Sequence, residues 1–459
     1  MPTPSTDSSE PLSILPSRDG HKPGRAKLLI VLGALVLLAS QVGLYLQLPP
    51  FPTWFYVFAW WSWILFADGV VHLRTGSSLL LSRPRSFLLL LPWSLAFWLS
   101  YEAANFLLLD WYYVFVPADP LERAIGILVS FATVLPGVLE TVDLLAALGF
   151  AKQRERRPLR FSPRGLHALF IAGLLFLVLP LVFPDYAYPL IWGAVVLLAE
   201  PLLFRAGKRC YLTQFASGDY SILCRHLVAG LSCGLLWEFW NYWATAKWIY
   251  TVPFFEEGKL FEMPVLGFLG YPPFALGIYS FVRALVALRL CPEFERTELP
   301  SKSTSPAAML QSSGVVLALL FSFAILPLVE QRTVRSTRPT VVELLANPSR
   351  TTLATDAGWT DFASVTDGLR MRESETLLGL TTEQREELLQ RAALMQLAGL
   401  GERGRLWLAS VGVESVKQLA SLSRADLERE VLEGGEGPPP KPYAREVRVW
   451  HRRALAANR

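Results

Sequence analysis

Two pairs of polar side chains interrupt apolar stretches of this sequence at the same spacing. Glu102 and Asn105 form the first pair, and Glu238 and Asn241 form the second. Residues three apart lie on one face of a helix, so each pair presents a carboxyl group and an amide together. A charge inside a membrane costs about 2.5–3.5 kcal/mol on insertion scales, which favours a function or a partner for each acid. We expect a polar cavity lined by paired acids or, alternatively, carboxyl–amide hydrogen bonds that join helices.

Five further ionisable residues fall inside apolar stretches: Asp68, Glu140, Asp143, Glu200 and Arg283. We expect Asp68 and Glu200 in the inner third of their helices and Glu102 and Glu238 in the outer third. An Arg inside a span usually pairs with an acid, and Arg283 could neutralise Glu140, Asp143 or Glu200. Carboxyl groups and amides of this kind could bind a small ligand or ion, or exchange protons with a substrate. The candidate ligand-binding residues are Glu102, Asn105, Glu238, Asn241, Asp68, Glu200, Glu140 and Arg283.

The sequence predicts no metal site and no cofactor. None of the four cysteines forms a C-x-x-C pair, and the five scattered histidines complete no zinc-ligand set with them. No P-loop or other nucleotide motif occurs. Any transport would therefore be secondary, or driven by a partner.

The two Glu-Asn pairs belong to longer matching segments. Residues 101–105 match residues 237–241, and each segment is followed by a Trp, a Tyr and a Val-Pro pair at nearly equal distances. This pattern predicts a duplication of residues 25–150 as 160–292, with the two halves related by an axis along the membrane normal.

Composition indicates the elements that carry these residues. Hydrophobic residues make up 52% of the 459 and charged residues 18%, against about 25% in soluble proteins. A membrane-spanning helix needs about 20 apolar residues. The predicted spans are 27–47, 52–73, 86–108, 122–148, 165–183, 186–204, 222–243, 271–290 and 308–329. We expect residues 1–24 to form a disordered tail and residues 25–330 to form the transmembrane bundle.

Loop charges predict the orientation in the cell's inner (plasma) membrane. Lys and Arg gather before the first span and after the second, fourth and sixth, whereas the intervening loops are acidic or poor in basic residues. Because cytoplasmic loops are basic, the N-terminus is expected in the cytoplasm. Nine spans then put the C-terminal part outside it.

The loop of residues 251–273 is apolar yet rich in Pro and Gly, which suits an interfacial or re-entrant segment at the outer side. Trp111, Trp243 and Trp248 are expected at the same level. They could form an ordinary aromatic belt, or a lid over the cavity of Glu102 and Glu238.

Residues 331–459 carry alternating charges and predict a soluble helical domain. Within residues 395–459, Gly399-Leu400-Gly401 and the stretch from Gly412 to Ala420 form turns of the hydrophobic-Gly-hydrophobic-Gly type. This part resembles the helix-hairpin-helix domain of unknown function found in bacterial proteins, and the bundle resembles uncharacterised bacterial multi-pass membrane proteins with a Trp-Glu-Phe-Trp-Asn stretch. Neither resemblance implies a reaction. The nearly balanced charge makes nucleic acid an unlikely partner and favours a protein partner or self-association.

The expected fold is an all-α polytopic bundle of about nine spans, two four-helix repeats plus one, with a small C-terminal helical domain. The lipid bilayer is an expected partner. Three functions agree with the sequence. The first is binding or transport of a small ligand or ion in an acid-lined cavity. The second is an intramembrane enzyme that acts on a lipid or isoprenoid by acid/base chemistry, and the third is a non-catalytic scaffold with an outer protein-interaction domain.

Overall fold

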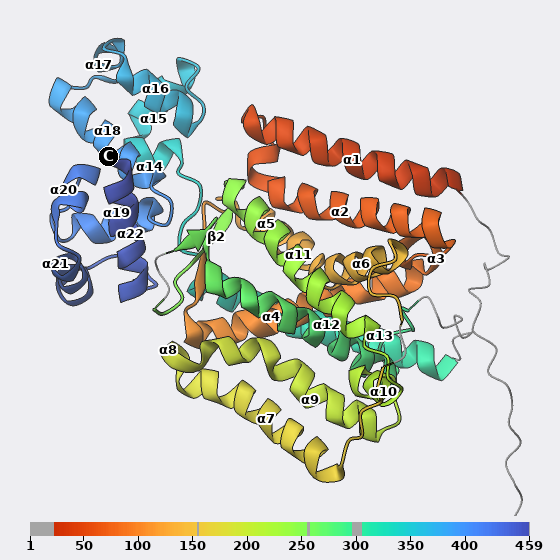
Figure 1. Ribbon diagram of the computed structural model, residues 1–459. Coiled ribbons are helices and arrows are strands. Elements are labelled where there is room, and N and C mark those ends of the chain that lie inside the picture. The colour runs from red at the N-terminus through yellow and green to blue at the C-terminus, as the bar shows by residue number, and fades with distance from the viewer. Residues whose placement is uncertain (1–22, 154–155, 255–257, 296–304, 459) are drawn as a thin grey trace, which may run out of the picture.

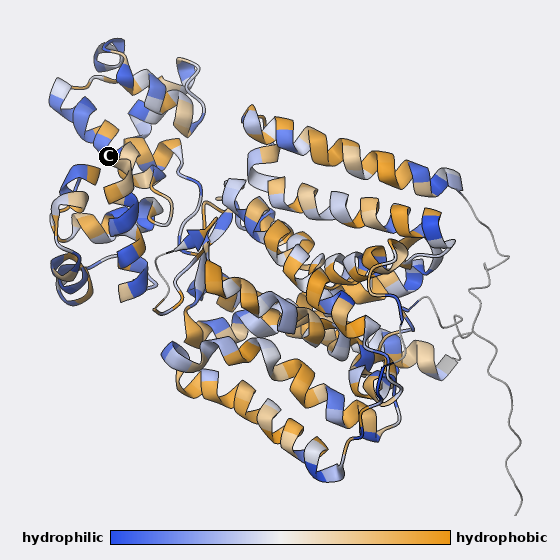
Figure 2. Cartoon of the chain, viewed as in Figure 1, coloured by the Kyte–Doolittle hydropathy of each residue, from blue (hydrophilic) through white to orange (hydrophobic). Residues whose placement is uncertain are grey.

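The computed structural model describes residues 23–153, 156–254, 258–295 and 305–458, and it is mostly helical (Figure 1). Within these ranges, nine helical segments are long and apolar enough to cross a membrane, which agrees with the predicted number. They are Pro23–Tyr45, Phe51–Thr75, Pro84–Leu108, Pro120–Ala147, Pro163–Val182, Pro184–Arg205, Ser221–Trp243, Val265–Ala287 and Pro306–Arg332. Figure 2 shows their apolar residues along the bundle, in contrast to the more hydrophilic C-terminal part.

Six of these segments are single helices: α1 (Pro23–Tyr45), α2 (Phe51–Thr75), α4 (Pro84–Leu108), α7 (Pro163–Val182), α11 (Ser221–Trp243) and α13 (Ser305–Arg332). The other three are interrupted: α5 (Pro120–Phe131) with α6 (Val134–Ala147), α8 (Pro184–Ala187) with α9 (Ile191–Arg205), and a 3-10 turn (Val265–Gly270) with α12 (Tyr271–Ala287). That turn starts the eighth segment six residues before the predicted 271. Helix α12 then begins at Tyr271, and Pro272 and Pro273 follow in its first turn, where missing backbone N–H groups cost little.

The expected tail, residues 1–24, is mostly outside the described residues. Its last two residues, Pro23 and Gly24, belong to α1, so the helix begins earlier than predicted. Helix α1 lies directly against α2 because small residues remove side-chain bulk there. A Cβ on Gly33 would stand 2.6 Å from the backbone oxygen of Ser62, and one on Gly69 would stand 2.7 Å from that of Ala26. Small residues at helix contacts are typical of membrane bundles.

The sequence predicted an all-α fold, but the structure also contains short strands. Strand β1 (Trp111–Val114) pairs antiparallel with β2 (Lys247–Tyr250), so that Trp111 lies opposite Tyr250 and Tyr113 opposite Trp248. A second small sheet joins β3 (Lys259–Leu260) to β4 (Met263–Pro264). After α13, Val334 and Thr337 form parallel bridges with Tyr113 and Val116. These strands were missed because β1 and β2 have four residues each and β3 and β4 have two, too few for a visible alternation of side chains.

The C-terminal part consists of short helices around two hydrophobic cores. Its elements are α14 (Val341–Leu345), α15 (Pro348–Asp356), α16 (Phe362–Arg370), α17 (Glu373–Leu378), α18 (Thr382–Gln396), α19 (Gly401–Ala409), α20 (Val416–Ser421), α21 (Arg424–Arg429), a π-turn (Glu430–Gly434) and α22 (Ala444–Ala457). It lies at the end of the bundle that carries β2, opposite the first residues of α1 (Figure 1). Two further short helices, α3 (Leu79–Ser82) and α10 (Tyr211–Ala216), follow the second and sixth segments.

The β1–β2 sheet joins the two parts of the molecule. Tyr112, Val114 and Ile249 from the sheet form one buried cluster with Val449 of α22. Trp450 Nε1 donates a hydrogen bond to the Gly399 carbonyl at 2.7 Å, and the Tyr112 hydroxyl reaches the same oxygen at 3.4 Å. The turn at Gly399 is therefore covered by the membrane part.

An ion pair adds to this contact and yields the first prediction. Arg453 of α22 donates to both carboxylate oxygens of Glu262 at 2.8 and 2.7 Å, and the Glu262 side chain is only 4% exposed. Arg453→Ala would leave a buried carboxylate with Lys247 alone, 3.9 Å away. We expect Arg453→Ala to lower the free energy of unfolding by about 1–3 kcal/mol. The loss is limited because Arg453 itself is partly exposed and water screens its charge.

Thermal unfolding in detergent, followed by circular dichroism, measures this loss. Arg424→Ala removes a half-exposed pair with Glu428 and is the matched control, with little expected effect. Equal Tm values for the two variants would show that the Arg453–Glu262 contact does not hold the C-terminal part in place.

Candidate functional site

The two Glu-Asn pairs occupy matching places at the ends of α4 and α11. The Asn105 side-chain amide donates to the Trp111 carbonyl at 2.9 Å, and its oxygen accepts from the Asp110 backbone N–H at 2.8 Å. The Asn241 amide bonds the Trp248 carbonyl and N–H in the same way, both at 3.0 Å. Each Asn thus fixes a strand to the helix before it. The amides bond backbone, not the neighbouring carboxyl groups.

Both glutamates are fully buried and accept hydrogen bonds from aromatic side chains. Glu102 Oε1 accepts from the Tyr113 hydroxyl at 2.5 Å and from the indoles of Trp98 and Trp111, each at 3.0 Å. Glu238 Oε1 accepts from the hydroxyls of Tyr250 at 2.8 Å and Tyr271 at 2.5 Å. In the described part of the chain, Oε2 of each glutamate has no hydrogen-bond partner.

Asp68 and Glu200 hold the short helices α3 and α10. The Leu80 N–H donates to Asp68 at 2.6 Å, and the Leu212 N–H donates to Glu200 at 3.0 Å. In both cases the donor is the second residue of the short helix, where unpaired N–H groups attract a carboxylate. Ser280 adds a hydrogen bond to Glu200 at 2.7 Å. These two acids are therefore helix caps, set apart from the outer pair.

Glu140 and Arg283 lie apart from each other. Arg283 bonds Glu293 at 2.9 Å and Glu295 at 3.4 Å, so the expected neutralisation of Glu140, Asp143 or Glu200 is wrong. The sequence obscured this pairing because the two acids follow α12 and lie beyond the predicted span. Glu140 is fully buried, and the charged groups that act on it are Asp68, Asp143 and Arg83.

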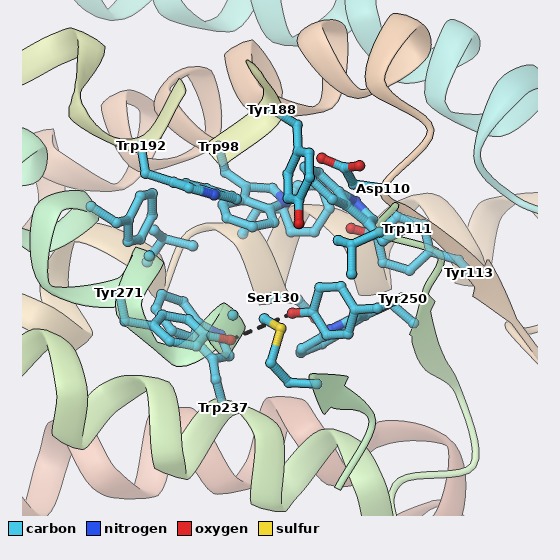
Figure 3. Close-up of a pocket in the computed structure, with 18 of the residues that line it drawn as sticks. Trp98, Asp110, Trp111, Tyr113, Ser130, Tyr188, Trp192, Trp237, Tyr250 and Tyr271 are labelled. Atoms are coloured by element: carbon cyan, nitrogen blue, oxygen red, sulfur yellow. Dashed lines mark hydrogen bonds between the residues drawn. The ribbon is translucent and has the colours of Figure 1, made fainter. Parts of the chain in front are cut away.

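The structure has one well-formed pocket near the outer acids, and aromatic rings line it (Figure 3). The space that no atom fills, together with the open mouth, is about 880 Å³. Its walls are Tyr56, Trp98, Asp110, Trp111, Tyr113, Ser130, Phe131, Val134, Tyr188, Trp192, Trp237, Trp248, Tyr250, Val252, Met263, Gly267, Gly270, Tyr271 and Phe274.

None of the eight candidate residues lines this pocket. The acid-lined cavity expected from the sequence thus differs from the pocket in the structure. The physical reason is that buried carboxylates need donors. Lining tyrosines and tryptophans donate their O–H and N–H groups to Glu102 and Glu238, which do not line the pocket themselves. The two glutamates support the pocket from behind.

Asp110 is a candidate site residue that sequence analysis missed, because it looked like an ordinary loop charge. It lines the pocket beside Tyr188 (Figure 3), is 3% exposed, and its Oδ1 has no hydrogen-bond partner among the described residues. Burial raises the pKa of this carboxyl group to about 8, although Arg445 lowers it. Its place between Asn105 and Trp111, in one of the two matching segments, was the available signal.

The second prediction tests the supporting role of Glu238. Glu238→Gln keeps an oxygen acceptor for Tyr250 and Tyr271, so the protein should fold with nearly wild-type stability. Glu238→Leu leaves the hydroxyls of Tyr250 and Tyr271 with only each other as partners, 3.4 Å apart, at about 1–3 kcal/mol for a group that stays unsatisfied. Thermal unfolding of both variants in detergent distinguishes them. A Leu variant as stable as the Gln variant would contradict the hydrogen-bond assignment.

Comparison of the chain with protein-family models, with curated proteins and with solved structures finds no match. Among the described residues, no group of three or more His, Cys, Asp or Glu side chains could hold a metal ion. A function can therefore be proposed only from the chemistry of the aromatic pocket.

Proposed function

We propose that this protein is an integral membrane protein that binds a small organic ligand in the aromatic pocket. The observation that carries this proposal is the wall itself, in which five tryptophans and five tyrosines surround one space. Aromatic side chains enclose a ligand with large, rigid, apolar surfaces and lose little conformational freedom. Binding could serve recognition or the first step of transport.

The support behind the wall favours a preformed site. Trp98, Trp111 and Tyr113 are each held by Glu102, and Tyr250 and Tyr271 by Glu238. A side chain locked by a buried hydrogen bond does not need to reorder when a ligand arrives. The buried acids are thus explained without contact to the ligand.

The third prediction tests the pocket with an uncharged probe, 3,3-dimethyl-1-butanol, followed by tryptophan fluorescence of the purified protein. Val252 lines the pocket, and Val252→Phe should fill part of it. We expect saturable binding by the wild-type protein and at least tenfold weaker binding by Val252→Phe.

Leu266→Phe is the matched control, because Leu266 is 55% exposed in the neighbouring turn and does not line the pocket. It should bind the probe as the wild type does. Identical titrations for all three proteins would mean that the probe enters only the detergent, and the proposed function would fail.

A second candidate, an intramembrane acid/base reaction on a lipid or isoprenoid, is favoured by one observation. The hydroxyls of Tyr250 and Tyr271 lie 3.4 Å apart at the pocket wall (Figure 3). Both also bond Glu238, which lies behind the wall. Such a pair could donate a proton to a bound double bond while the aromatic faces stabilise the resulting cation. A non-catalytic scaffold would need neither this pair nor the pocket.

The matching geometry supports a duplication of residues 25–150 as 160–292. Four features recur: a Glu bonded by a strand tyrosine, an Asn bonded to the strand, an acid that caps a short helix, and the strand itself. The β1–β2 register pairs the Trp of each half with the Tyr of the other. We attribute this arrangement to two equivalent halves related by a two-fold axis along the membrane normal.

The C-terminal part, residues 331–459, is proposed to carry a helix-hairpin-helix-like unit from 395 onward. Gly399, Gly401 and Gly412 have positive φ angles at the turns between its helices, where glycine is favoured. Since the first turn is covered by Tyr112 and Ile249, its backbone cannot face nucleic acid phosphates. Its exposed helices, such as α15–α17, could instead bind a protein partner or a second copy.

The fourth prediction concerns orientation in the plasma membrane. The basic loops support a cytoplasmic N-terminus, and the opposite end of the bundle carries the C-terminal part (Figure 1). A reporter fused after Arg459 should behave as extracytoplasmic, and one inserted after Arg160 as cytoplasmic. A cytoplasmic signal from the C-terminal fusion would show that Ser305–Arg332 does not cross the membrane.

A further inference from the structure

Asp110 brings one carboxylate to a pocket whose other walls are almost wholly apolar. It is the one ionisable acid or base, apart from tyrosines, among the described lining residues. Its side chain is buried, and Oδ1 has no hydrogen-bond partner in the described structure. A buried acceptor without a donor is costly, so this oxygen lacks something that a ligand could supply.

The rings beside Asp110 favour positive charge. Trp111 and Trp192 lie nearly parallel, with ring centroids 6.2 Å apart and planes at 28°, and Tyr188 points into the space near the carboxylate (Figure 3). Aromatic faces carry negative electrostatic potential and attract cations within about 6 Å of the ring centre. The faces and the carboxylate therefore select the same sign of charge.

The charged groups around Asp110 have a net negative charge that one added positive charge would neutralise. Arg445 of α22 lies 3.5 Å from Asp185 and donates to the Leu108 carbonyl at 2.8 Å. Arg445 and Asp185 both act electrostatically on Asp110. With Asp110 ionised, these three groups carry two negative charges and one positive charge.

The hydrogen-bond acceptors of the wall limit which kinds of cation the pocket can bind. A primary ammonium group needs three hydrogen-bond acceptors. Besides Asp110 and Ser130, the pocket offers tyrosine hydroxyls, and three of these already bond Glu102 or Glu238. A quaternary ammonium group needs none and presents methyl groups to the rings. We propose that the ligand of this pocket is a small organic cation with a quaternary ammonium group, and that Asp110 is its counter-charge; this inference rests on the proposed function.

Ionisation of Asp110 gives the inference a second consequence. In the empty pocket its carboxyl group has a pKa near 8, raised by burial against the lowering effect of Arg445 and with a further rise from Asp185. The carboxyl group is therefore largely protonated at pH 6.5 and largely ionised at pH 9. A cation binds the ionised form, so its affinity should rise as pH increases across this window.

The fifth prediction compares choline with 3,3-dimethyl-1-butanol, which has the same shape but carries carbon in place of the charged nitrogen. Neither compound titrates between pH 6.5 and 9, and tryptophan fluorescence reports both. Choline should bind at least tenfold more tightly at pH 8.5, which is 1.4 kcal/mol. Its affinity should fall at pH 6.5, whereas that of the alcohol should stay constant.

Asp110→Asn keeps the size of the side chain and removes its charge. It should weaken choline binding at least tenfold, abolish the pH dependence, and change the affinity of the alcohol less than twofold. Asp361→Asn, at the exposed start of α16 in the C-terminal part, is the matched control and should leave both affinities unchanged. If Asp110→Asn does not fold, the difference between the two probes in the wild-type protein still decides the question.

Three results would overturn the inference. Equal affinities of the two probes would contradict the proposal of a cationic ligand. They would not contradict the proposal that the pocket binds a small organic ligand. Equal weakening of both probes by Asp110→Asn would assign Asp110 to a structural pairing with Arg445. If Val252→Phe affects neither probe, the proposed function fails, and the cation site fails with it.

Discussion

A polar side chain inside the apolar part of this chain must find its hydrogen-bond partner within the protein, because neither lipid nor a packed core supplies one. The arrangement around Glu102 and Glu238 follows from this constraint. Each carboxylate takes its donors from nearby aromatic side chains, which come from the strand after its own helix or from neighbouring helix ends. The rings are consequently fixed in orientation, and their faces enclose a pocket.

The same constraint explains the β1–β2 sheet. Asn105 and Asn241 each bond the backbone where the chain leaves its helix, and the two strands then satisfy each other's remaining groups. Because the sheet is anchored at both ends, it offers a stable surface to the C-terminal part. Tyr112 and Ile249 on one side of the sheet contact that part, and Trp111, Tyr113 and Tyr250 line the pocket. Ligand site and domain contact thus share one small element.

Asp110 differs from Glu102 and Glu238 because it lines the pocket itself. Its backbone N–H is bonded by Asn105, while its carboxylate oxygen Oδ1 lacks a donor in the described structure. Residues that keep an unfavourable arrangement often do so at functional sites. Glu102 lies behind the wall and accepts hydrogen bonds from three aromatic side chains, whereas Asp110 is part of the wall, and this difference separates a supporting acid from a proposed binding one.

The number of spans followed from the sequence, because runs of about 20 apolar residues have few alternatives to crossing a membrane. The spacing of Glu102 with Asn105 and of Glu238 with Asn241 also indicated that these residues act together. Tertiary structure decided their roles. Local spacing could not reveal that each Asn bonds a strand, that Asp68 and Glu200 cap helices, or that Arg283 pairs with Glu293 beyond its own helix. The pocket depends on how each aromatic ring is oriented toward its glutamate. Contacts between residues far apart in the sequence set this orientation, such as the hydrogen bond between Tyr271 and Glu238, 33 positions away.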